Sequence, residues 1–394
     1  MKTKVLVGIT ALLTALLVAM VCLFLVLDRK YREQNKANYA DDMSYFLECM
    51  ELEKEWISKQ QSKEGAIYLY ELEEKTEGSV VPYFACQAAL GMLAGNPNKD
   101  ELDIVGDYLN WHTGELIQSK GMISDYRVVS GELISKGTSD SIDSYVAMYL
   151  TLLATFVESE GELDGIEYAE AAVNVCAQRL EELNTKGLTK VAPGKEVYYL
   201  MDNVEVLQAY GKILNLLQSG NKAVEKWNSK ETLTKFFEDA QTECREAITQ
   251  YMWNQDEKRF EIGVQKGFER MEFKGYKEFY PYAVAQVYPI ACGLEIVSKD
   301  DAEVLYERIS KVHKWSSVGV EEDFDWPVLA YVAVKLGDVE SAERYLATYR
   351  YKYAKDRSYP FNTSNAAWAA MAYEELYKHY EEKSNKGLLD LIFE

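Results

Sequence analysis

Acidic and aromatic residues gather just before six apolar stretches of this chain. Asp140 and Asp143 lie three residues apart before one stretch, and Asp202 opens the next. A glycosidic bond is cleaved by two carboxyl groups, one acting as acid and the other as base or nucleophile. Tyr and Trp have an apolar ring that can pack on a sugar and a polar group that can hydrogen-bond. The pattern therefore favours a cleft that binds and hydrolyses a glycan.

These positions give two sets of candidate site residues. The candidate catalytic carboxylates are Asp143, Asp202, Asp140, Glu71 and Asp325. The candidate ligand-binding residues are Tyr83, Tyr126, Tyr145, Asn203, Trp253, Tyr280, Asp323, Trp326 and Asn365. The two sets together predict one cleft that carries both the chemistry and the stacking surfaces.

The surroundings of each carboxylate suggest its role. A helix dipole stabilises an anion in the first turn, so Asp143 and Asp202 suit a general base or nucleophile. A general acid needs a raised pKa, which apolar surroundings provide. Glu71, Asp323 and Asp325 each stand beside aromatic or aliphatic residues. The sequence leaves the choice of the acid among these residues open.

Simpler interpretations exist for several of these residues. Aspartate is a favoured N-cap, so Asp140, Asp202 and Asp325 could serve only to start their helices. Asp143 is harder to explain in this way, because two acids one helical turn apart raise each other's pKa. Trp253 and Trp326 could pack in the core instead of lining the cleft.

The apolar stretches are predicted to be the inner helices of a ring. They begin near Pro82, Asp143, Asp202, Pro281, Pro327 and Thr363, and an amphipathic helix precedes each one. A helix that is apolar on all sides is buried on all sides, and a recurring helix pair indicates a repeat architecture. We expect an all-α fold, an (α/α)6 toroid of six hairpins whose inner helices place their N-termini at one face. An open α-solenoid is the alternative, but its inner helices would normally be polar on the concave side.

The N-terminus predicts a membrane anchor. Residues 1–4 form a short basic tail, and residues 5–27 form an apolar run; about 20 such residues span a bilayer. A cleavage site of the Ala-x-Ala type is missing, which favours an uncleaved signal anchor in the cell membrane. The basic residues after the run favour a cytoplasmic domain under the positive-inside rule. The layout of a short basic N-terminus before a long apolar run favours the outer face, which we prefer.

The remaining chain is divided by composition. We expect a juxtamembrane linker at 28–38, the toroid at 39–385 and a C-terminal tail at 386–394.

The net charge of −21 argues against a nucleic-acid partner and makes a strongly anionic polymer an awkward ligand. The chain has only 3 His and no Cys-x-x-Cys motif, so no metal and no cofactor is predicted. Apart from Cys22 in the apolar run, the scattered cysteines are expected to be buried free thiols.

The sequence resembles the six-hairpin glycosidase superfamily over roughly residues 40–385. The resemblance lies in the rhythm of helix pairs, in the segment Asp140-x-x-Asp143-Ser-Tyr145, and in Leu200-Met-Asp202-Asn203. The second segment is similar to the inner-helix start of unsaturated-glucuronyl hydrolases, and this implies that Asp202 is a general acid/base, in conflict with the dipole argument. The Ser-Glu-Gly signature of family-8 glucanases is absent, and Thr76-Glu77-Gly78 is a loose counterpart.

Two other functions fit the same pattern. A non-catalytic glycan-binding or scaffold component of a polysaccharide system would use the same cleft with a degenerate site. A polysaccharide lyase would need basic residues or a metal near a uronate and a Tyr or His that abstracts a proton. Of the three histidines only His313 lies near a predicted cleft segment, so the lyase ranks third.

Overall fold

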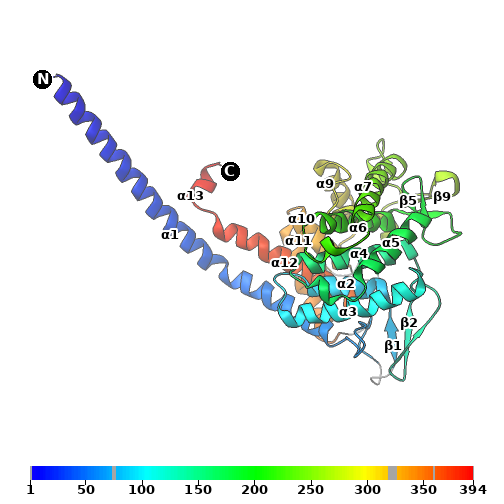
Figure 1. The fold of residues 1–394 in the computed structure, drawn as a ribbon. Helices are drawn as coiled ribbons and strands as arrows, with labels where there is room; N and C mark the ends of the chain where they lie inside the picture. Colours follow the sequence, from blue (N-terminus) through cyan, green and yellow to red (C-terminus); the bar gives the residue numbers. More distant parts are fainter. Residues whose placement is uncertain (1, 73–76, 318–325, 358–359, 394) are drawn as a thin grey trace. The chain divides into compact units, whose positions relative to one another are not determined.

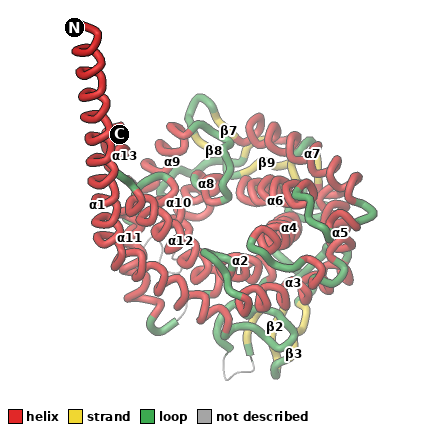
Figure 2. Tube along the Cα trace, turned by 60° about the vertical axis from the view of Figure 1, so that its left-hand side comes forward, coloured by secondary structure: helices red, strands yellow, loops and turns green. Residues whose placement is uncertain are grey.

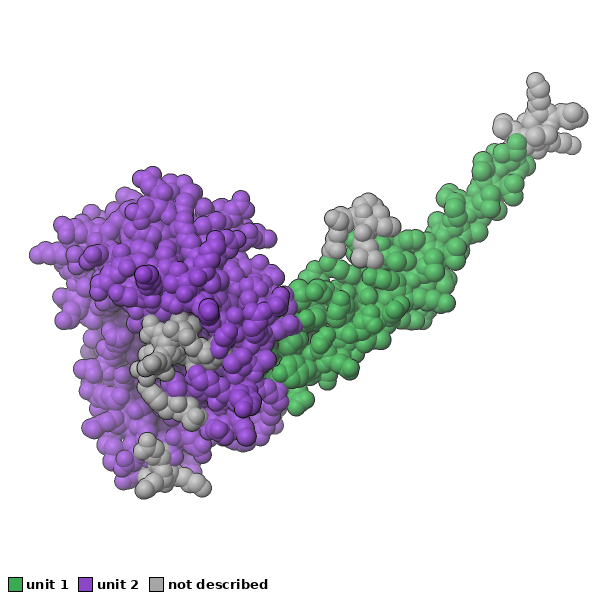
Figure 3. Space-filling model, turned by 180° about the vertical axis from the view of Figure 1, so that it is seen from behind, with its two compact units in different colours: residues 1–49, 373–394 green, residues 50–372 purple. Residues whose placement is uncertain are grey.

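The structure is a computed structural model that describes residues 2–72, 77–317, 326–357 and 360–393. It divides into two compact units, residues 1–49 with 373–394 and residues 50–372 (Figure 3). The smaller unit contains most of α1 (Lys2–Ser58), the end of α12 (Thr363–Asn385) and α13 (Leu388–Phe393) (Figure 1). The ring that carries the predicted site belongs to the larger unit.

Helices of two kinds alternate along the larger unit, as the sequence predicts. The inner members are α2 (Pro82–Met92), α4 (Ile142–Glu158), α6 (Leu200–Gln218), an irregular segment at 279–291, α10 (Val328–Lys335) and the start of α12. The outer members are the end of α1, α3 (Lys99–Ser119), α5 (Ala169–Leu183), α7 (Lys230–Ala247), α9 (Lys299–Val312) and α11 (Val339–Tyr349). Figure 2 shows them arranged as a ring around a central axis. The closed (α/α)6 toroid is therefore the fold of this unit.

Burial explains why each helix takes its place. Nearly every residue of α4 from Ile142 to Ala154 is buried, including Asp143 and Ser144. The outer helix α7 buries only one stripe, formed by Leu233, Phe237, Ala240, Cys244 and Ala247. Such a stripe covers one side of a helix and leaves the polar side to solvent. Apart from the exposed Cys22, the cysteines in the described residues are buried thiols that form no disulfide, as expected.

The fourth inner segment differs from the others. It consists of the π-helical turn η5 (Phe279–Ala283), the 3-10 turn η6 (Val284–Gln286) and the short helix α8 (Tyr288–Ala291). A proline in the middle of an apolar helical stretch, as Pro289 is here, predicts one helix with a kink. The structure instead ends one turn at Val287 and starts a new helix with Pro289 in its first turn, where a missing amide proton is tolerated.

Short strands, which the sequence analysis did not predict, lie in loops before the inner helices. One sheet has the order β1 (Gly78–Val80), β2 (Tyr126–Val129), β3 (Glu132–Ser135), and another has the order β10 (Glu269–Arg270), β9 (Gly263–Gln265), β6 (Val197–Tyr199). Two further hairpins pair β4 (Asn184–Thr185) with β5 (Leu188–Thr189) and β7 (Trp253–Asn254) with β8 (Arg259–Phe260). All pairs are antiparallel. Strands of two to four residues are too short to show an alternating pattern.

The smaller unit contains the predicted membrane segment. Among the described residues, one helix, α1, is long and apolar enough to cross a membrane, and its apolar stretch is not buried. The expected linker at 28–38 is helical and continuous with α1. Within this unit the Asp28 carboxylate accepts hydrogen bonds from Arg32 and from the Leu388 amide, at 2.9 and 2.7 Å. The expected C-terminal tail at 386–394 thus includes the ordered helix α13.

Candidate functional site

A cavity of about 390 Å³ opens at the N-terminal ends of the inner helices. Its wall takes residues from the first turns of α2, α4 and α6, from the segment 279–291, and from the starts of α10 and α12. Of the predicted site residues, those that line it are Tyr83, Asp140, Tyr145, Asp202, Tyr280, Trp326 and Asn365. The ring therefore brings together residues that lie as far apart in the sequence as Tyr83 and Asn365, as the parallel inner helices predict.

A serine connects two carboxyl groups at the starts of α4 and α6. Ser141 Oγ lies 2.6 Å from Asp143 Oδ1 and 2.7 Å from Asp202 Oδ2. A hydroxyl has one proton to donate, so one of the two carboxyl groups must itself be the donor. Burial raises the pKa of Asp202 well above its usual value, and the nearby carboxylates of Asp143 and Glu205 raise it further. The raised pKa favours Asp202 as the protonated partner, in which case Ser141 donates to Asp143.

Asp143 is fully buried behind Ser141 and does not line the cavity. Its carboxylate also accepts hydrogen bonds from the Ser144 amide at 3.0 Å and the Thr189 hydroxyl at 2.7 Å. Burial raises the pKa of Asp143 to about 6, although these donors act in the opposite direction. The predicted role of Asp143 as a direct catalyst does not fit this position, because a ligand in the cavity cannot reach it.

The dipole argument for Asp202 also gave the wrong direction. It predicted a stabilised anion, whereas burial and the neighbouring carboxylates of Asp143, Glu205 and Asp140 raise the pKa of Asp202. The role implied by the family resemblance, a general acid/base, agrees with a carboxyl group whose pKa is raised. The helix dipole acts on every first-turn residue, but it does not outweigh burial here.

A second buried carboxylate, Glu205, lies one turn further along α6. Its Oε1 accepts hydrogen bonds from the hydroxyls of Tyr83 and Tyr288, both at 2.5 Å, and its Oε2 accepts one from Ser144. Burial raises the pKa of Glu205 to about 7. Tyr83, Tyr288 and Ser144 also line the cavity, so Glu205 fixes the hydroxyl groups of its floor.

Two further carboxylates come from the loop around the β2–β3 hairpin. Asp125 is half-buried, and its Oδ1 accepts a hydrogen bond from the Tyr145 hydroxyl at 2.8 Å. Burial raises the pKa of Asp125. Asp140 is exposed on the other side of the same loop, which closes through the Asp125 amide donating to the Thr138 carbonyl at 2.9 Å. Both side chains line the cavity.

Pairs of aromatic rings form parts of the wall. The rings of Tyr280 and Trp326 are stacked, with centroids 5.5 Å apart and planes at 20°. The rings of Tyr83 and Tyr145 lie 5.9 Å apart at 30°. Neutral polar groups come from Gln87, Asn362, Ser364 and Asn365. Such a wall offers apolar faces together with hydrogen-bonding groups, which is what a sugar ring requires.

Four further predicted residues in the described ranges do not line this cavity. Asn203 is fully buried, where it bonds the Thr189 backbone and the Tyr199 carbonyl. Tyr126 is buried against Trp111 and donates a hydrogen bond to Glu115. Glu71 is exposed and lies outside the cavity wall. Asp323 and Asp325 lie outside the described residues.

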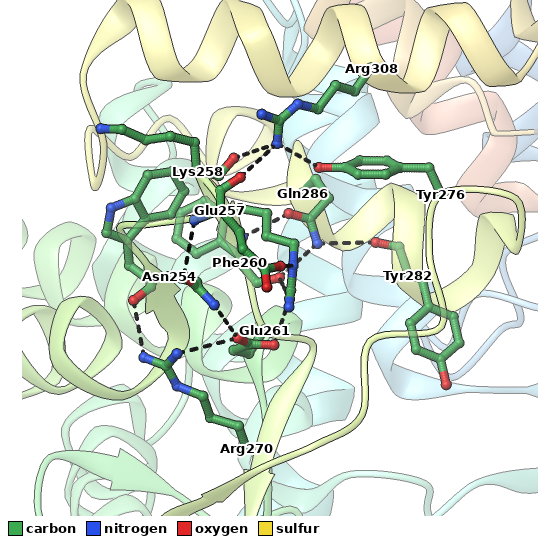
Figure 4. Close-up of polar contacts among 12 residues, drawn as sticks. Asn254, Glu257, Lys258, Phe260, Glu261, Arg270, Tyr276, Tyr282, Gln286 and Arg308 are labelled. Atoms are coloured by element: carbon green, nitrogen blue, oxygen red, sulfur yellow. Dashed lines mark hydrogen bonds and ion pairs between the residues drawn. The ribbon is translucent and has the colours of Figure 1, made fainter.

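Trp253, the fourth, packs on Phe260 within the β7–β8 hairpin and its indole nitrogen donates to Gln255. Figure 4 shows how this hairpin is held: buried Glu261 accepts a hydrogen bond from Asn254 and pairs with Arg270. Gln286, from the fourth inner segment, bonds both the amide and the carbonyl of Phe260. Trp253 therefore has a structural role, because the polar groups of its neighbours form hydrogen bonds and ion pairs with one another.

Glu205, Tyr288 and Asp125 are not among the site residues predicted from the sequence. The spacing in the sequence could have indicated Glu205, since it follows Asp202 by three residues and so lies on the same face of α6. No such spacing indicates Tyr288, because its position depends on the irregular turns of the fourth inner segment. Among the described residues, no group of three or more His, Cys, Asp or Glu side chains is arranged to hold a metal ion.

Comparison with solved structures shows the same fold in several proteins. A glycosidase superimposes with a TM-score of 0.57 at 13% identity, over 86% of this chain and 98% of its own. An uncharacterised conserved protein from Thermus thermophilus gives 0.56 at 11% identity, over 82% of this chain and 98% of its own. A GH63 mannosylglycerate hydrolase from the same organism, solved with glucose, gives 0.54 at 10% identity, over 82% and 99%.

At these identities the likeness shows the fold alone, which is the helical toroid. No protein-family model matches the sequence, and no curated protein sequence is similar to it.

Proposed function

We propose that this protein is a glycoside hydrolase in which Asp202 is the general acid and Asp140 is the general base. The observation that carries the proposal is a cavity at the inner-helix N-termini that combines carboxyl groups with stacked aromatic rings. The structural neighbours named as glycosidases share the fold and support the reaction class. The substrate is a poly- or oligosaccharide of the envelope or the extracellular space.

The two roles follow from the surroundings of each carboxyl group. Asp202 lines the cavity with a raised pKa, so it holds a proton that it can give to the leaving oxygen. Asp140 also lines the cavity but is exposed, so water can approach its carboxylate and lose a proton to it. Asp143 is a positioning residue, because it orients Ser141, which in turn bonds Asp202.

The location is part of the same proposal. The apolar start of α1 supports a single-pass anchor, and the basic tail before it supports placement of the ring on the outer face of the cell membrane. A glycan of the envelope or beyond is the carbohydrate that such a tethered ring meets.

The test of the acid uses the full chain in detergent with a panel of glycans and aryl glycosides. Asp202→Asn should lower kcat by roughly 10²- to 10⁴-fold, the usual contribution of general acid catalysis. Substrates with a strongly acidic aryl leaving group should lose much less, because they leave without protonation. Binding of the uncleaved glycan should change little, because Asn keeps the shape of the side chain.

The test of the base uses an added nucleophile. Asp140→Asn should also lose activity, and azide should restore turnover with a glycosyl azide as product. Glu71→Gln is the control, since this exposed carboxylate lies outside the cavity wall. If the chain binds glycans but cleaves none of them, the non-catalytic binding component replaces the hydrolase.

The residues that line the cavity do not support the alternative function of a polysaccharide lyase. None of its described lining residues is Lys, Arg or His, so nothing there would neutralise a uronate. His313 is held by the Tyr276 carbonyl at 2.6 Å and does not line the wall.

A further inference from the structure

The described wall of the cavity contains acidic side chains but no basic ones. Asp125, Asp140 and Asp202 line it, and its other described residues are neutral. Asp143 and Glu205 lie directly behind, each within one hydrogen bond of a lining serine. Five carboxyl groups therefore face or underlie the same small volume.

The partners of these carboxyl groups are neutral as well. Asp143 bonds Ser141, the Ser144 amide and Thr189. Glu205 bonds two tyrosine hydroxyls and Ser144, and Asp125 bonds the Tyr145 hydroxyl. Hydroxyl and amide donors satisfy the oxygen atoms but do not balance the negative charge, and Lys136, whose positive charge acts on Asp125 from nearby, does not line the cavity. A positively charged ligand group would provide that balance.

Hydrolysis leaves one of the lining carboxylates without a role. The proposed reaction uses Asp202 as acid and Asp140 as base, so Asp125 is surplus to it. Asp125 comes from the β2 end of the hairpin and is held in place by the Tyr145 hydroxyl at 2.8 Å. A half-buried carboxylate that is fixed by a neutral donor is suited to pair with a cation.

The aromatic rings favour the same kind of ligand. Tyr145, which holds Asp125, forms a ring pair with Tyr83, and Tyr280 is stacked with Trp326 on the wall. The faces of these rings are electron-rich and attract cations as well as the apolar face of a sugar. A uronate would add a negative charge to this wall and would be repelled by it.

We propose that the cavity prefers sugars that carry a free, protonated amino group, and that the Asp125 carboxylate binds this ammonium group. The assignment rests on the proposed hydrolase only in leaving Asp125 free of an acid or base role. The substrate class is then a glycan with de-N-acetylated amino sugars, in preference to N-acetylated or uronic acid residues.

The test measures binding of small sugars, so that linkage does not enter. The probes are the methyl glycosides of glucosamine, galactosamine and mannosamine, with the matching N-acetylated, neutral and uronic acid sugars. Saturation-transfer NMR on the full chain in detergent at about pH 7 gives their relative Kd values. We expect at least one amino sugar to bind about tenfold more tightly than its N-acetylated form, and the uronic acids to bind more weakly still.

Two variants test whether the preference for amino sugars depends on Asp125. Asp125→Asn should remove the preference for the amine while leaving binding of the neutral sugar within about twofold. Glu71→Gln changes a carboxylate outside the cavity and should leave the preference intact. Equal or tighter binding of the N-acetylated or uronic acid sugars, loss of all sugars alike in Asp125→Asn, or no binding of any sugar would overturn the inference.

The hydrolase and the amine preference can fail separately. Cleavage of neutral or N-acetylated glycans by a chain that shows no amine preference would reject the inference and keep the hydrolase. Tight, Asp125-dependent binding of amino sugars without cleavage of any glycan would reject the hydrolase and keep the inference.

Discussion

At the scale of single residues, the decisive feature is the competition of forces on Asp202. The helix dipole stabilises an anion in the first turn by about 0.3–1 kcal/mol. One pKa unit corresponds to about 1.4 kcal/mol, so a dipole of this size is outweighed where burial and three nearby carboxylates raise the pKa. Glu205 is one of these three carboxylates, and it does not line the cavity itself. We therefore regard Glu205 as a positioning residue that helps Asp202 to keep its proton.

Glu205→Gln should move the basic limb of the kcat pH profile. The amide keeps an oxygen for Tyr83 and Tyr288 but removes a negative charge that raises the pKa of Asp202. A general acid works only while it is protonated, so activity should now be lost at lower pH. The shift should be roughly one pH unit downward, as is usual for removal of a nearby like charge. The measurement is kcat against pH on a substrate that the unmodified chain cleaves.

Glu115→Gln is the matched control for this shift. Glu115 also accepts a hydrogen bond from a tyrosine, Tyr126 at 2.5 Å, but it does not line the cavity. The profile of kcat against pH for Glu115→Gln should coincide with that of the unmodified chain. An unchanged or upward-shifted basic limb in Glu205→Gln, with thermal unfolding showing a folded protein, would contradict the assignment.

At the scale of elements, the ring closes where the first and last inner helices meet. Gly91 in α2 packs against Ala367 in α12, and a Cβ built at Gly91 would lie 2.4 Å from the Ala367 Cα and 2.5 Å from its Cβ. The atoms in the way belong to a helix backbone, so they cannot rotate aside. Small residues therefore set the distance between these two helices, and both helices contribute to the cavity wall.

Gly91→Ala should destabilise the larger unit by about 1–3 kcal/mol, the usual cost of overpacking a core. The first and last inner helices would have to move apart, so we also expect weaker glycan binding. Chemical denaturation followed by circular dichroism measures the first effect.

Gly114→Ala serves as the comparison. Gly114 lies at an exposed position in the outer helix α3, and a Cβ added there would have no neighbouring atom within 4 Å. The same substitution should stabilise the protein there by about 0.5–1 kcal/mol, because alanine restricts the unfolded chain and favours the helix. Equal effects at the two sites would show that helix propensity, and not the contact with Ala367, determines the result at Gly91.

At the scale of the whole molecule, the apolar N-terminal segment and the first outer helix of the ring belong to one continuous helix. α1 runs from Lys2 to Ser58 without interruption, so its residues contribute to both compact units. The apolar side chains near its start are exposed, for example Leu12 and Leu13 at 62% and 61%. Burying such side chains in lipid is strongly favourable, which supports the proposed tether.

The full chain should sediment with membranes and resist extraction at alkaline pH. Replacing three of the apolar residues, Leu12, Leu16 and Val18, by Asp should release it, because a charged residue in the centre of a span costs about 2.5–3.5 kcal/mol. Substitution of the exposed Leu389 by Asp, outside the apolar run, is the control. Protease added to intact cells should cut the ring if it lies on the outer face. Protection from that protease would place the ring in the cytoplasm.

The sequence alone predicts much of this architecture. Binary patterning is local information, so the apolar and amphipathic helices could be assigned in order, and their pairing implied the toroid. The same logic placed Tyr83, Asp140, Tyr145 and Asp202 at one face, since residues that start parallel inner helices must meet there. The composition also argued against a nucleic-acid ligand, because the chain carries a large excess of acidic residues.

Only the tertiary structure decided what each side chain does at that face. Asp143 and Asp202 look equivalent in the sequence, yet Asp143 is buried behind Ser141 while Asp202 lines the cavity. Glu205 lies behind the floor that Tyr288 helps to form, and the two meet because the fourth inner segment is irregular. Burial and charge at a point depend on all the elements that surround it, so they are fixed by packing across the ring and not by neighbours in the chain.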